Sequence, residues 1–385
     1  MSLTGPALLL LAVLSAVAAL AGTVALWPRF AARGAVPVAS RTGLILLSDV
    51  TVLLVVAVVL NDQFGFFADW TDLAGALGAG AAATTATGGA APSVAFGREP
   101  VTTAAPARSL PPLPPGQGPG GRVLTYTVTG ARSGLTGEVL VDLPPSYRDP
   151  RAAGRAYPVL ETFSGYPGSA AQWIGTMHLP AALDAATAAG RLGQTLVVSP
   201  VLEIPPGEDT ECVDGGPGHA LETWVSHDVP AWVQQHFRVV PDRRAWATIG
   251  LSAGGWCSAM TTMLHPQRFG AAVVMGGYFR PEFTGPPPFP PAGPQARRYD
   301  LVGLAGRAAP PVALWLETSH ADRLSYASST ALLRAARPPM SVRSVVLEHA
   351  GHRIGVWQGL LPQALGWLGS TVPGFAPSGP ATVTG

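Results

Sequence analysis

Residues 248 to 255 read Thr248-Ile249-Gly250-Leu251-Ser252-Ala253-Gly254-Gly255 and carry a G-x-S-x-G pattern centred on Ser252. The preceding run, 245–249, is continuously apolar, as a strand buried on both faces would be, and the following run, 253–265, is helical in pattern. Small residues on either side of Ser252 allow a sharp turn that exposes its hydroxyl group. The stretch therefore predicts a nucleophilic serine at a strand-to-helix turn, and a plain structural turn is the alternative.

The same alternation of strands and helices continues over about 250 residues on both sides of this turn. Buried strands are predicted at 158–163, 195–199, 245–249, 271–275, 312–317 and 342–347, after an antiparallel edge pair at 123–129 and 136–142. Helices are predicted at 221–237, 253–265, 324–336 and 354–368. Continuous rather than alternating apolar strands are typical of a parallel sheet covered by helices. The fold class is therefore α/β, with a mostly parallel sheet and helices on both faces.

A serine hydroxyl at its ordinary pKa is a weak nucleophile, so a general base and an acid that orients it are expected further along the chain. Asp322 lies in the loop after the next-to-last strand, and His352 follows the last strand immediately before a helix. The order Ser252, Asp322, His352 predicts a catalytic triad. Two alternatives remain open, because Glu317 ends the strand before Asp322 and His349 is three residues from His352.

Backbone N–H groups beside the serine are expected to bind the negative oxygen that forms during acyl transfer. One donor is predicted to be Ala253, which follows the nucleophile, and the other Tyr166, in the loop Phe163-Ser164-Gly165-Tyr166-Pro167-Gly168 after an earlier strand. The alternative for this loop is a plain turn imposed by its glycine and proline residues.

Composition excludes several other classes of protein. The chain has 385 residues, of which 12% are charged, and its formal net charge of +1 gives no basic surface for nucleic acid. Two cysteines can form neither a metal cluster nor a disulfide-rich scaffold, and the spacings of the histidines give no metal site. No cofactor is expected.

Two charge-free or nearly charge-free apolar runs near the N-terminus, Ala7 to Trp27 and Gly43 to Leu60, are each about long enough to cross a bilayer. A cleaved signal peptide is the alternative for the first run, but no basic residue precedes it. The connector between the runs contains Arg29, Arg33 and Arg41 and no acid, which predicts that it is cytoplasmic and that both chain ends face outward.

Asp49 lies within the second run, where it is expected to stay protonated or to hydrogen-bond to the neighbouring helix, a functional role being the alternative. The aromatic residues that follow, Phe64, Phe66, Phe67 and Trp70, predict an interfacial belt. The predicted organisation is an anchor at 1–73, an Ala/Gly/Thr/Pro-rich tether at 74–121, a catalytic domain at 122–370 and a flexible tail at 371–385.

Several short motifs together resemble one family. They are Tyr157-Pro158-Val159-Leu160, Gly165-Tyr166-Pro167-Gly168, Gly250-Leu251-Ser252-Ala253-Gly254-Gly255, His265-Pro266-Gln267-Arg268-Phe269, Gly276-Gly277-Tyr278-Phe279 and Gly351-His352 with Trp357. The combination is similar to the putative-esterase family of α/β-hydrolases, which includes S-formylglutathione hydrolase-like esterases and secreted actinobacterial mycolyltransferases. One departure is Ser164, which stands where the family usually has a histidine before Gly165. The membrane runs and tether resemble cell-surface actinobacterial versions.

These features predict a membrane-anchored, extracytoplasmic serine esterase or acyltransferase that forms an acyl-enzyme on a carboxylic ester. The expected partners are the membrane and an ester such as a lipid or glycolipid of the cell envelope. The alternative from another class is a catalytically silent domain that binds an envelope component. A peptidase is disfavoured because no segment suggests a peptide-binding insert.

The two cysteines are expected to pair in such a fold. Cys257 lies on the helix after the nucleophile, and Cys212 lies in the loop Pro205 to Gly218 at the carboxyl end of an earlier strand, which should run close to that helix. An oxidising exterior would let a Cys212–Cys257 disulfide persist. The alternative is a buried Cys257 and a free Cys212 thiol.

Overall fold

The chain divides into two compact units. The computed structural model describes residues 2–78, 96, 101–104, 110–113, 117, 120–216 and 218–377. The smaller unit contains Met1–Thr84 and two loop segments from later in the chain, His320–Arg323 and Glu348–Arg353. The larger unit contains the rest of the chain and all the strands.

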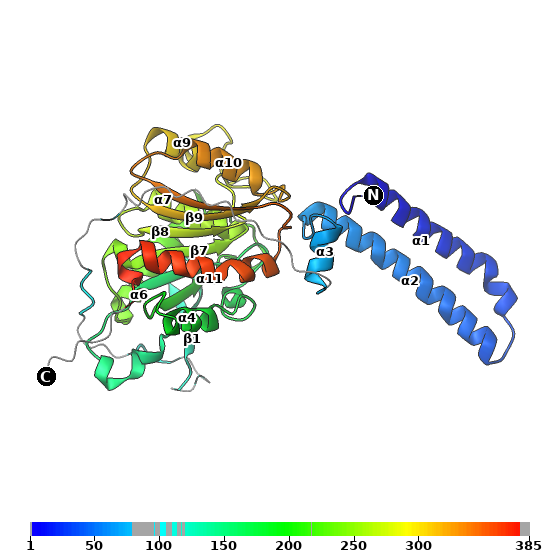
Figure 1. Ribbon diagram of the computed structural model, residues 1–385, viewed down its shortest axis with the longest axis horizontal. Helices are drawn as coiled ribbons and strands as arrows, with labels where there is room; N and C mark the ends of the chain where they lie inside the picture. Colours follow the sequence, from blue (N-terminus) through cyan, green and yellow to red (C-terminus); the bar gives the residue numbers. More distant parts are fainter. Residues whose placement is uncertain are drawn as a thin grey trace. The chain divides into compact units, whose positions relative to one another are not determined.

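Three helices make up most of the smaller unit: α1 (Pro6–Leu26), α2 (Ala35–Phe64) and the short α3 (Trp70–Ala76). The first two form a hairpin (Figure 1), in which the Thr23 hydroxyl lies 3.0 Å from the Ser48 hydroxyl. Asp49, the neighbour of Ser48, is exposed on α2. The Thr23 hydroxyl also donates to the Leu44 carbonyl oxygen at 3.2 Å, so Ser48 and Leu44, rather than the exposed Asp49, supply polar contacts between the two helices.

Both hairpin helices are long and apolar enough to cross a membrane. Much of their surface consists of exposed leucine and valine side chains, for example Leu10, Leu14, Val24, Leu46 and Leu53. Helix α2 has 30 residues and extends beyond the predicted run 43–60 at both ends. Its polar ends, Ser40 to Thr42 and Asn61 to Gln63, continue the helical hydrogen bonding although they do not belong to the apolar run.

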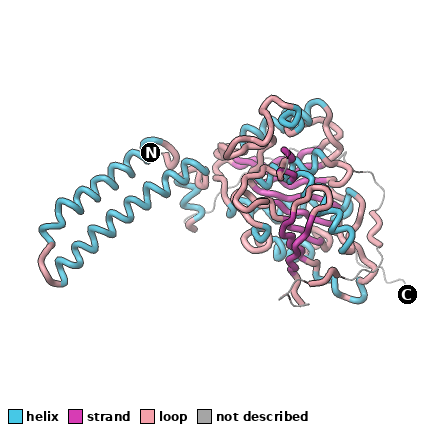
Figure 2. Tube along the Cα trace, turned by 180° about the vertical axis from the view of Figure 1, so that it is seen from behind, coloured by secondary structure: helices cyan, strands magenta, loops and turns pink. Residues whose placement is uncertain are grey.

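The larger unit is built on one eight-stranded sheet in the order β1-β2-β4-β3-β7-β8-β9-β10, which lies inside a layer of helices (Figure 2). The strands are β1 (Val123–Thr129), β2 (Thr136–Asp142), β3 (Val159–Phe163), β4 (Leu196–Pro200), β7 (Trp246–Leu251), β8 (Ala271–Met275), β9 (Ala313–Ser319) and β10 (Ser341–Leu347). β1 pairs antiparallel with β2 and β2 with β4, and the other pairs are parallel. The predicted edge pair and the mostly parallel sheet are confirmed.

Helices cover both faces of this sheet. α4 (Leu179–Ala188) and α11 (Ile354–Thr371) pack together on one face (Figure 1). On the other face α7 (Ala253–Leu264) packs against β3, β7 and β8. The helix predicted at 221–237 is interrupted, because α5 (Leu221–Thr223) and α6 (Val229–His236) flank a π-helical turn, Trp224–Asp228.

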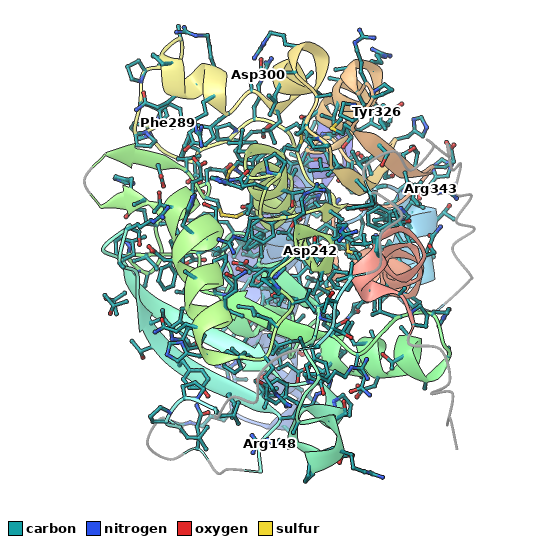
Figure 3. The ribbon with its side chains drawn as sticks, turned by 90° about the vertical axis from the view of Figure 1, so that its left-hand side faces the viewer. Arg148, Asp242, Phe289, Asp300, Tyr326 and Arg343 are labelled. Atoms are coloured by element: carbon teal, nitrogen blue, oxygen red, sulfur yellow. A yellow bond between two sulfur atoms is a disulfide. The ribbon has the colours of Figure 1, made fainter. Side chains whose placement is uncertain are left out.

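The predicted helix 324–336 is confirmed by α10 (Tyr326–Ala335). The other remaining elements are short and were not predicted. They are α8 (Pro294–Arg298), α9 (Leu301–Arg307) and the two-stranded β5 (Asp214–Gly216) and β6 (His219–Ala220). Tyr326 of α10 and Arg343 of β10 mark one edge of the sheet in Figure 3, and Arg148, just after β2, marks the other.

Two predicted boundaries need correction. The tether was predicted to begin at residue 74, but α3 continues to Ala76; most of 74–121 lies outside the described residues. The tail was predicted to begin at 371, yet Val372 and Phe375 are buried and Phe375 accepts a backbone hydrogen bond from Gly193. Burial of these two apolar side chains holds the chain on the larger unit as far as the 3₁₀ turn Pro373–Phe375.

Candidate active site

Ser252 occupies a strained turn between β7 and α7. Its backbone angles are φ 55° and ψ −125°, in a region that non-glycine residues rarely adopt. The turn is held by the Ser252 N–H, which donates to the Met275 carbonyl oxygen on β8 at 2.9 Å. Strain of this kind persists only where surrounding structure imposes it, and it is concentrated at functional sites.

The glycines on either side of Ser252 are required by close backbone approach. A Cβ on Gly254 would lie 2.1 Å from the Phe163 carbonyl oxygen, and one on Gly250 would lie 1.8 Å from the Gly254 carbonyl oxygen. A side chain at position 254 would push the first turn of α7 away from the end of β3, and one at position 250 would push it away from β7. The G-x-S-x-G pattern therefore has a steric cause in this fold.

The loop after β3 lies next to the nucleophile turn. A Cβ on Gly165 would lie 3.4 Å from the Ser252 Cβ, and the Gly165 N–H donates to the Gln172 side chain at 2.9 Å. Tyr166 and Ala253 line one small pocket. Within the described residues, the backbone N–H groups of Tyr166 and Ala253 have no protein acceptor. Two unused donors beside one serine can bind an oxyanion.

The other wall of this pocket is the loop 202–212, which the sequence places near the helix after Ser252, although sequence reasoning did not connect its carboxylates with the site. It carries four carboxylates, Glu203, Glu208, Asp209 and Glu211. Glu203 accepts hydrogen bonds from the N–H groups of Gly168, at 2.6 Å, and Gly207, at 3.0 Å. The density of acids just before Cys212 was the available signal. The pocket beside Ser252 is consequently acidic on one side.

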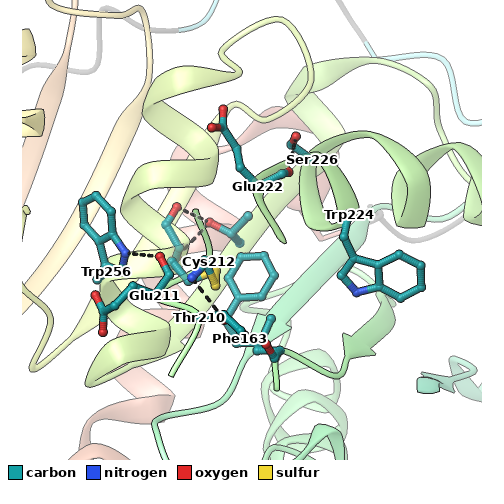
Figure 4. Close-up of a disulfide and its surroundings, with 12 residues drawn as sticks. Phe163, Thr210, Glu211, Cys212, Glu222, Trp224, Ser226 and Trp256 are labelled. Atoms are coloured by element: carbon teal, nitrogen blue, oxygen red, sulfur yellow. Dashed lines mark hydrogen bonds between the residues drawn. A yellow bond between two sulfur atoms is a disulfide. The ribbon is translucent and has the colours of Figure 1, made fainter. Parts of the chain in front are cut away.

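A disulfide between Cys212 and Cys257 joins this acidic loop to α7, as the sequence predicts (Figure 4). The Trp256 indole N–H also donates to the Glu211 carbonyl oxygen at 2.7 Å. Glu211 and Cys212 both have positive φ, 44° and 50°, so the loop reaches the helix through two strained residues. The covalent bond and the indole hydrogen bond together hold this strained segment beside α7.

Glu211 is the most perturbed carboxylate of the pocket. Burial raises the pKa of Glu211 to about 8, although hydrogen bonds from the Tyr278 hydroxyl at 2.5 Å and the Glu282 N–H at 2.9 Å oppose the rise. The carboxyl group is therefore mostly protonated at neutral pH.

Asp322 and His352 contact each other in the smaller unit. His352 Nδ1 lies 2.9 Å from Asp322 Oδ2, and both side chains are buried. Because a carboxylate only accepts hydrogen bonds, Nδ1 carries the proton and Nε2 is left as the basic nitrogen. The pair has the arrangement of a general base and the acid that orients it. Ser252 belongs to the larger unit.

The two rival residues have other contacts. Glu317, at the end of β9, accepts hydrogen bonds from the Trp357 indole at 3.1 Å and the Gly276 N–H at 3.0 Å. These contacts tie β9 to α11 and to the chain after β8. The exposed His349 ring lies 3.3 Å from Asp69. The structure thus places Asp322, and not Glu317, against His352.

The sequence of the larger part of the chain matches a known protein family. A family model described as Putative esterase matches residues 134–368. The chain is 32% identical over 146 residues to a Corynebacterium glutamicum protein described as uncharacterised, which covers 36% of this chain and 32% of that protein. The chain therefore spans about a third of the length of that relative.

Solved structures share the fold at low sequence identity. A ferulic acid esterase has 21% identity and a TM-score of 0.54, with 65% of this chain and 97% of that chain covered. An S-formylglutathione hydrolase from Agrobacterium tumefaciens has 16% identity and a TM-score of 0.53, with 65% and 95% covered. At these identities the likeness is one of fold.

Reduction of the disulfide is expected to lower stability. The bond closes a loop with a sequence separation of 45 residues, for which chain entropy predicts roughly 4 kcal/mol of stabilisation. Thiol counting on the denatured, unreduced protein should find no free thiol, and melting after reduction should occur at a lower temperature. Two titratable thiols, or an unchanged melting temperature on reduction, would contradict this prediction.

The buried carboxyl of Glu211 predicts a pH-dependent stability. Between its ordinary pKa of 4.5 and the folded value of about 8, the folded chain binds the additional proton, so the free energy of unfolding falls as pH rises, by about 1.4 kcal/mol for each pH unit inside this window. Glu211→Gln removes this dependence. The melting temperature of Glu211→Gln minus that of wild type should therefore increase from pH 5 to pH 8.

The control for this experiment is Glu138→Gln, which changes an exposed glutamate in β2. Its melting temperature should stay parallel to that of wild type over the same range. Parallel curves for Glu211→Gln and wild type would show that the Glu211 carboxyl is ionised in the folded protein below pH 8.

Proposed function

Since the chain belongs to the putative esterase family, we propose that it is a membrane-anchored serine esterase or acyltransferase acting on a carboxylic ester. The observation that carries this proposal is the 2.9 Å contact between His352 and Asp322. It leaves Nε2 of a buried imidazole as a base, which is what a serine held at a strained, partly exposed turn requires. Ser252 is proposed as the nucleophile.

In the proposed first step, Ser252 Oγ bonds to the ester carbonyl carbon and its proton passes to His352 Nε2. The carbonyl π electrons move onto the oxygen, and the N–H groups of Tyr166 and Ala253 stabilise the resulting oxyanion. The intermediate then expels the alcohol, which takes the proton from Nε2 as the ester C–O bond breaks. Asp322 stays ionised and stabilises the imidazolium.

In the second step an acceptor hydroxyl attacks the acyl-enzyme, with His352 acting again as base and then as acid. Water as acceptor makes the enzyme an esterase, and a sugar hydroxyl makes it an acyltransferase. A lipid or glycolipid ester of the cell envelope fits the proposed location at a membrane. A domain that only binds such a ligand would have no need for a buried base and acid in contact.

Membrane anchoring rests on the exposed apolar surfaces of α1 and α2. In lipid these surfaces are satisfied, whereas in water they would form one large hydrophobic patch. The basic connector with Arg29, Arg33 and Arg41 is proposed to lie in the cytoplasm, which puts the larger unit outside.

The triad is tested by substitution. Ser252→Ala and His352→Ala should each lower kcat by about a million-fold, because the members of such a triad act as a unit. Asp322→Asn should lower kcat by about ten thousand-fold without unfolding the protein, because it favours the wrong tautomer of His352. The measurements are p-nitrophenyl ester hydrolysis and fluorophosphonate labelling of Ser252. Wild-type turnover by Ser252→Ala would refute the function, and a larger loss from Glu317→Gln than from Asp322→Asn would move the acid.

The orientation is tested with single introduced thiols. The described residues contain no free cysteine, so Ala32→Cys, between α1 and α2, and Ala153→Cys, on the larger unit, each provide one reactive site. An impermeant maleimide added to intact cells should label Ala153→Cys at once and Ala32→Cys only after permeabilisation. The opposite pattern would place the larger unit in the cytoplasm.

A further inference from the structure

The chain immediately after α2 is folded into a tight corner by its own side chains. Gly65 ends α2 in the left-handed conformation, with φ 64°. The Asn61 side chain closes the corner on both sides, because it accepts from the Phe67 N–H at 2.7 Å and donates to the Phe67 carbonyl at 3.1 Å. Asp69 caps α3 by accepting from the Asp72 N–H at 2.8 Å. The Asp72 carboxylate is thereby held in one place.

The loop of the proposed catalytic base is bound at this corner. The His352 N–H donates to the Gly65 carbonyl at 2.8 Å, and the Gly351 N–H donates to Asp72 Oδ2 at 3.1 Å. The Arg353 guanidinium makes two parallel hydrogen bonds to Asp72, each 2.6 Å long. Three consecutive residues centred on His352 thus each donate hydrogen bonds to the segment from Gly65 to Asp72, which runs from the end of α2 into α3.

These contacts are buried. The Asp72 side chain is 2% exposed and that of Arg353 is 17% exposed. A two-point Arg–carboxylate pair fixes geometry as well as charge, and loss of one partner leaves the other buried without compensation. The Arg353 guanidinium also lies over the Phe67 ring, 5.0 Å from its centre. Phe67, predicted as part of an interfacial belt, therefore packs on Arg353.

Gly351 gives independent support for this close fit. A Cβ at this position would lie 2.2 Å from the Phe66 carbonyl oxygen and 2.8 Å from the Gly65 carbonyl oxygen. No such approach is possible with any other residue, although Gly351 does not have a positive φ. The glycine before His352 thus has its steric cause in the chain after α2.

We propose that the segment Gly65–Ala76 is part of the active site and that Asp72 is a positioning residue for His352. Asp322 holds one ring nitrogen of His352, and the Asp72 carboxylate holds the Gly351 backbone on one side of it and the Arg353 side chain on the other. A proton transfer with Ser252 tolerates little displacement of the imidazole, and an error of about 1 Å can cost about 100-fold in rate. The membrane anchor is then required for turnover as well as for location. An anchor that was joined to the catalytic residues only by a tether would determine location alone. This inference rests on the proposed function.

The test uses the full chain, purified in detergent, and the variant Asp72→Asn. Fluorophosphonate titration counts competent Ser252 sites, and p-nitrophenyl butyrate hydrolysis gives kcat per titrated site and KM. We expect the number of sites and KM to stay near wild type and kcat per site to fall about 100-fold. The control is Asp149→Asn, which breaks an exposed Asp–Arg pair with Arg151 and should leave all three quantities unchanged.

A double-variant cycle tests whether Asp72 acts through its ion pair with Arg353. Arg353→Gln should lower kcat per site by a factor similar to that of Asp72→Asn, and the double variant should be no worse than either single one, because the two act as a pair. Gly351→Ala provides a second route to the same displacement, and it should also lower kcat per site.

The outcomes separate this inference from the proposed function. Wild-type kcat per site in Asp72→Asn and Gly351→Ala would overturn the positioning role, as would a loss confined to the number of titratable sites, which would mean a purely structural role. In either case the loss of activity in Ser252→Ala would still support the proposed function. Failure of the wild-type protein to label at Ser252 would overturn both.

Discussion

The crossing of α7 over the end of β3 is the constraint on which the larger unit depends. At this crossing Gly254 lies so close to the Phe163 carbonyl that a Cβ would stand 2.1 Å from it. The short separation lets the chain leave β7, turn at Ser252 and enter a helix within one residue. The positive φ of Ser252 is the local cost of that turn, and the sheet around it supplies the hydrogen bonds and packing that make the strain tolerable.

The wall of the pocket next to this turn is held in place by unusual means. Two consecutive residues with positive φ, a disulfide to α7 and an indole hydrogen bond hold loop 202–212 beside the start of α7. The carboxylates of this loop have no part in the proposed acyl transfer. They make one side of the pocket acidic, and Glu211 adds a carboxyl that is protonated at neutral pH. Negative charge on this wall would repel an anionic group placed in the pocket.

The smaller unit combines two kinds of structure with different physical demands. The surfaces of α1 and α2 are apolar and suit lipid, whereas the segment after α2 is a dense network of buried polar groups. That network is complete only with Gly351, His352 and Arg353, which come from far along the chain. Asp72 and Arg353 are 281 residues apart, so the network depends wholly on tertiary folding.

Much of this protein was determined by local sequence. Apolar periodicity predicted the sheet strands to within about two residues, because strands buried on both faces need continuous apolar runs. The G-x-S-x-G pattern, the two long apolar helices and the resemblance to the family were also local features. The choice between Asp322 and Glu317 was not a local feature. Glu317 lies near the end of β9 and Asp322 just after it, so only the path of the loop decides which carboxylate reaches His352. The Asp72–Arg353 pair left no pattern in the sequence, since its partners meet only when distant segments pack together. Tertiary structure alone decided these contacts.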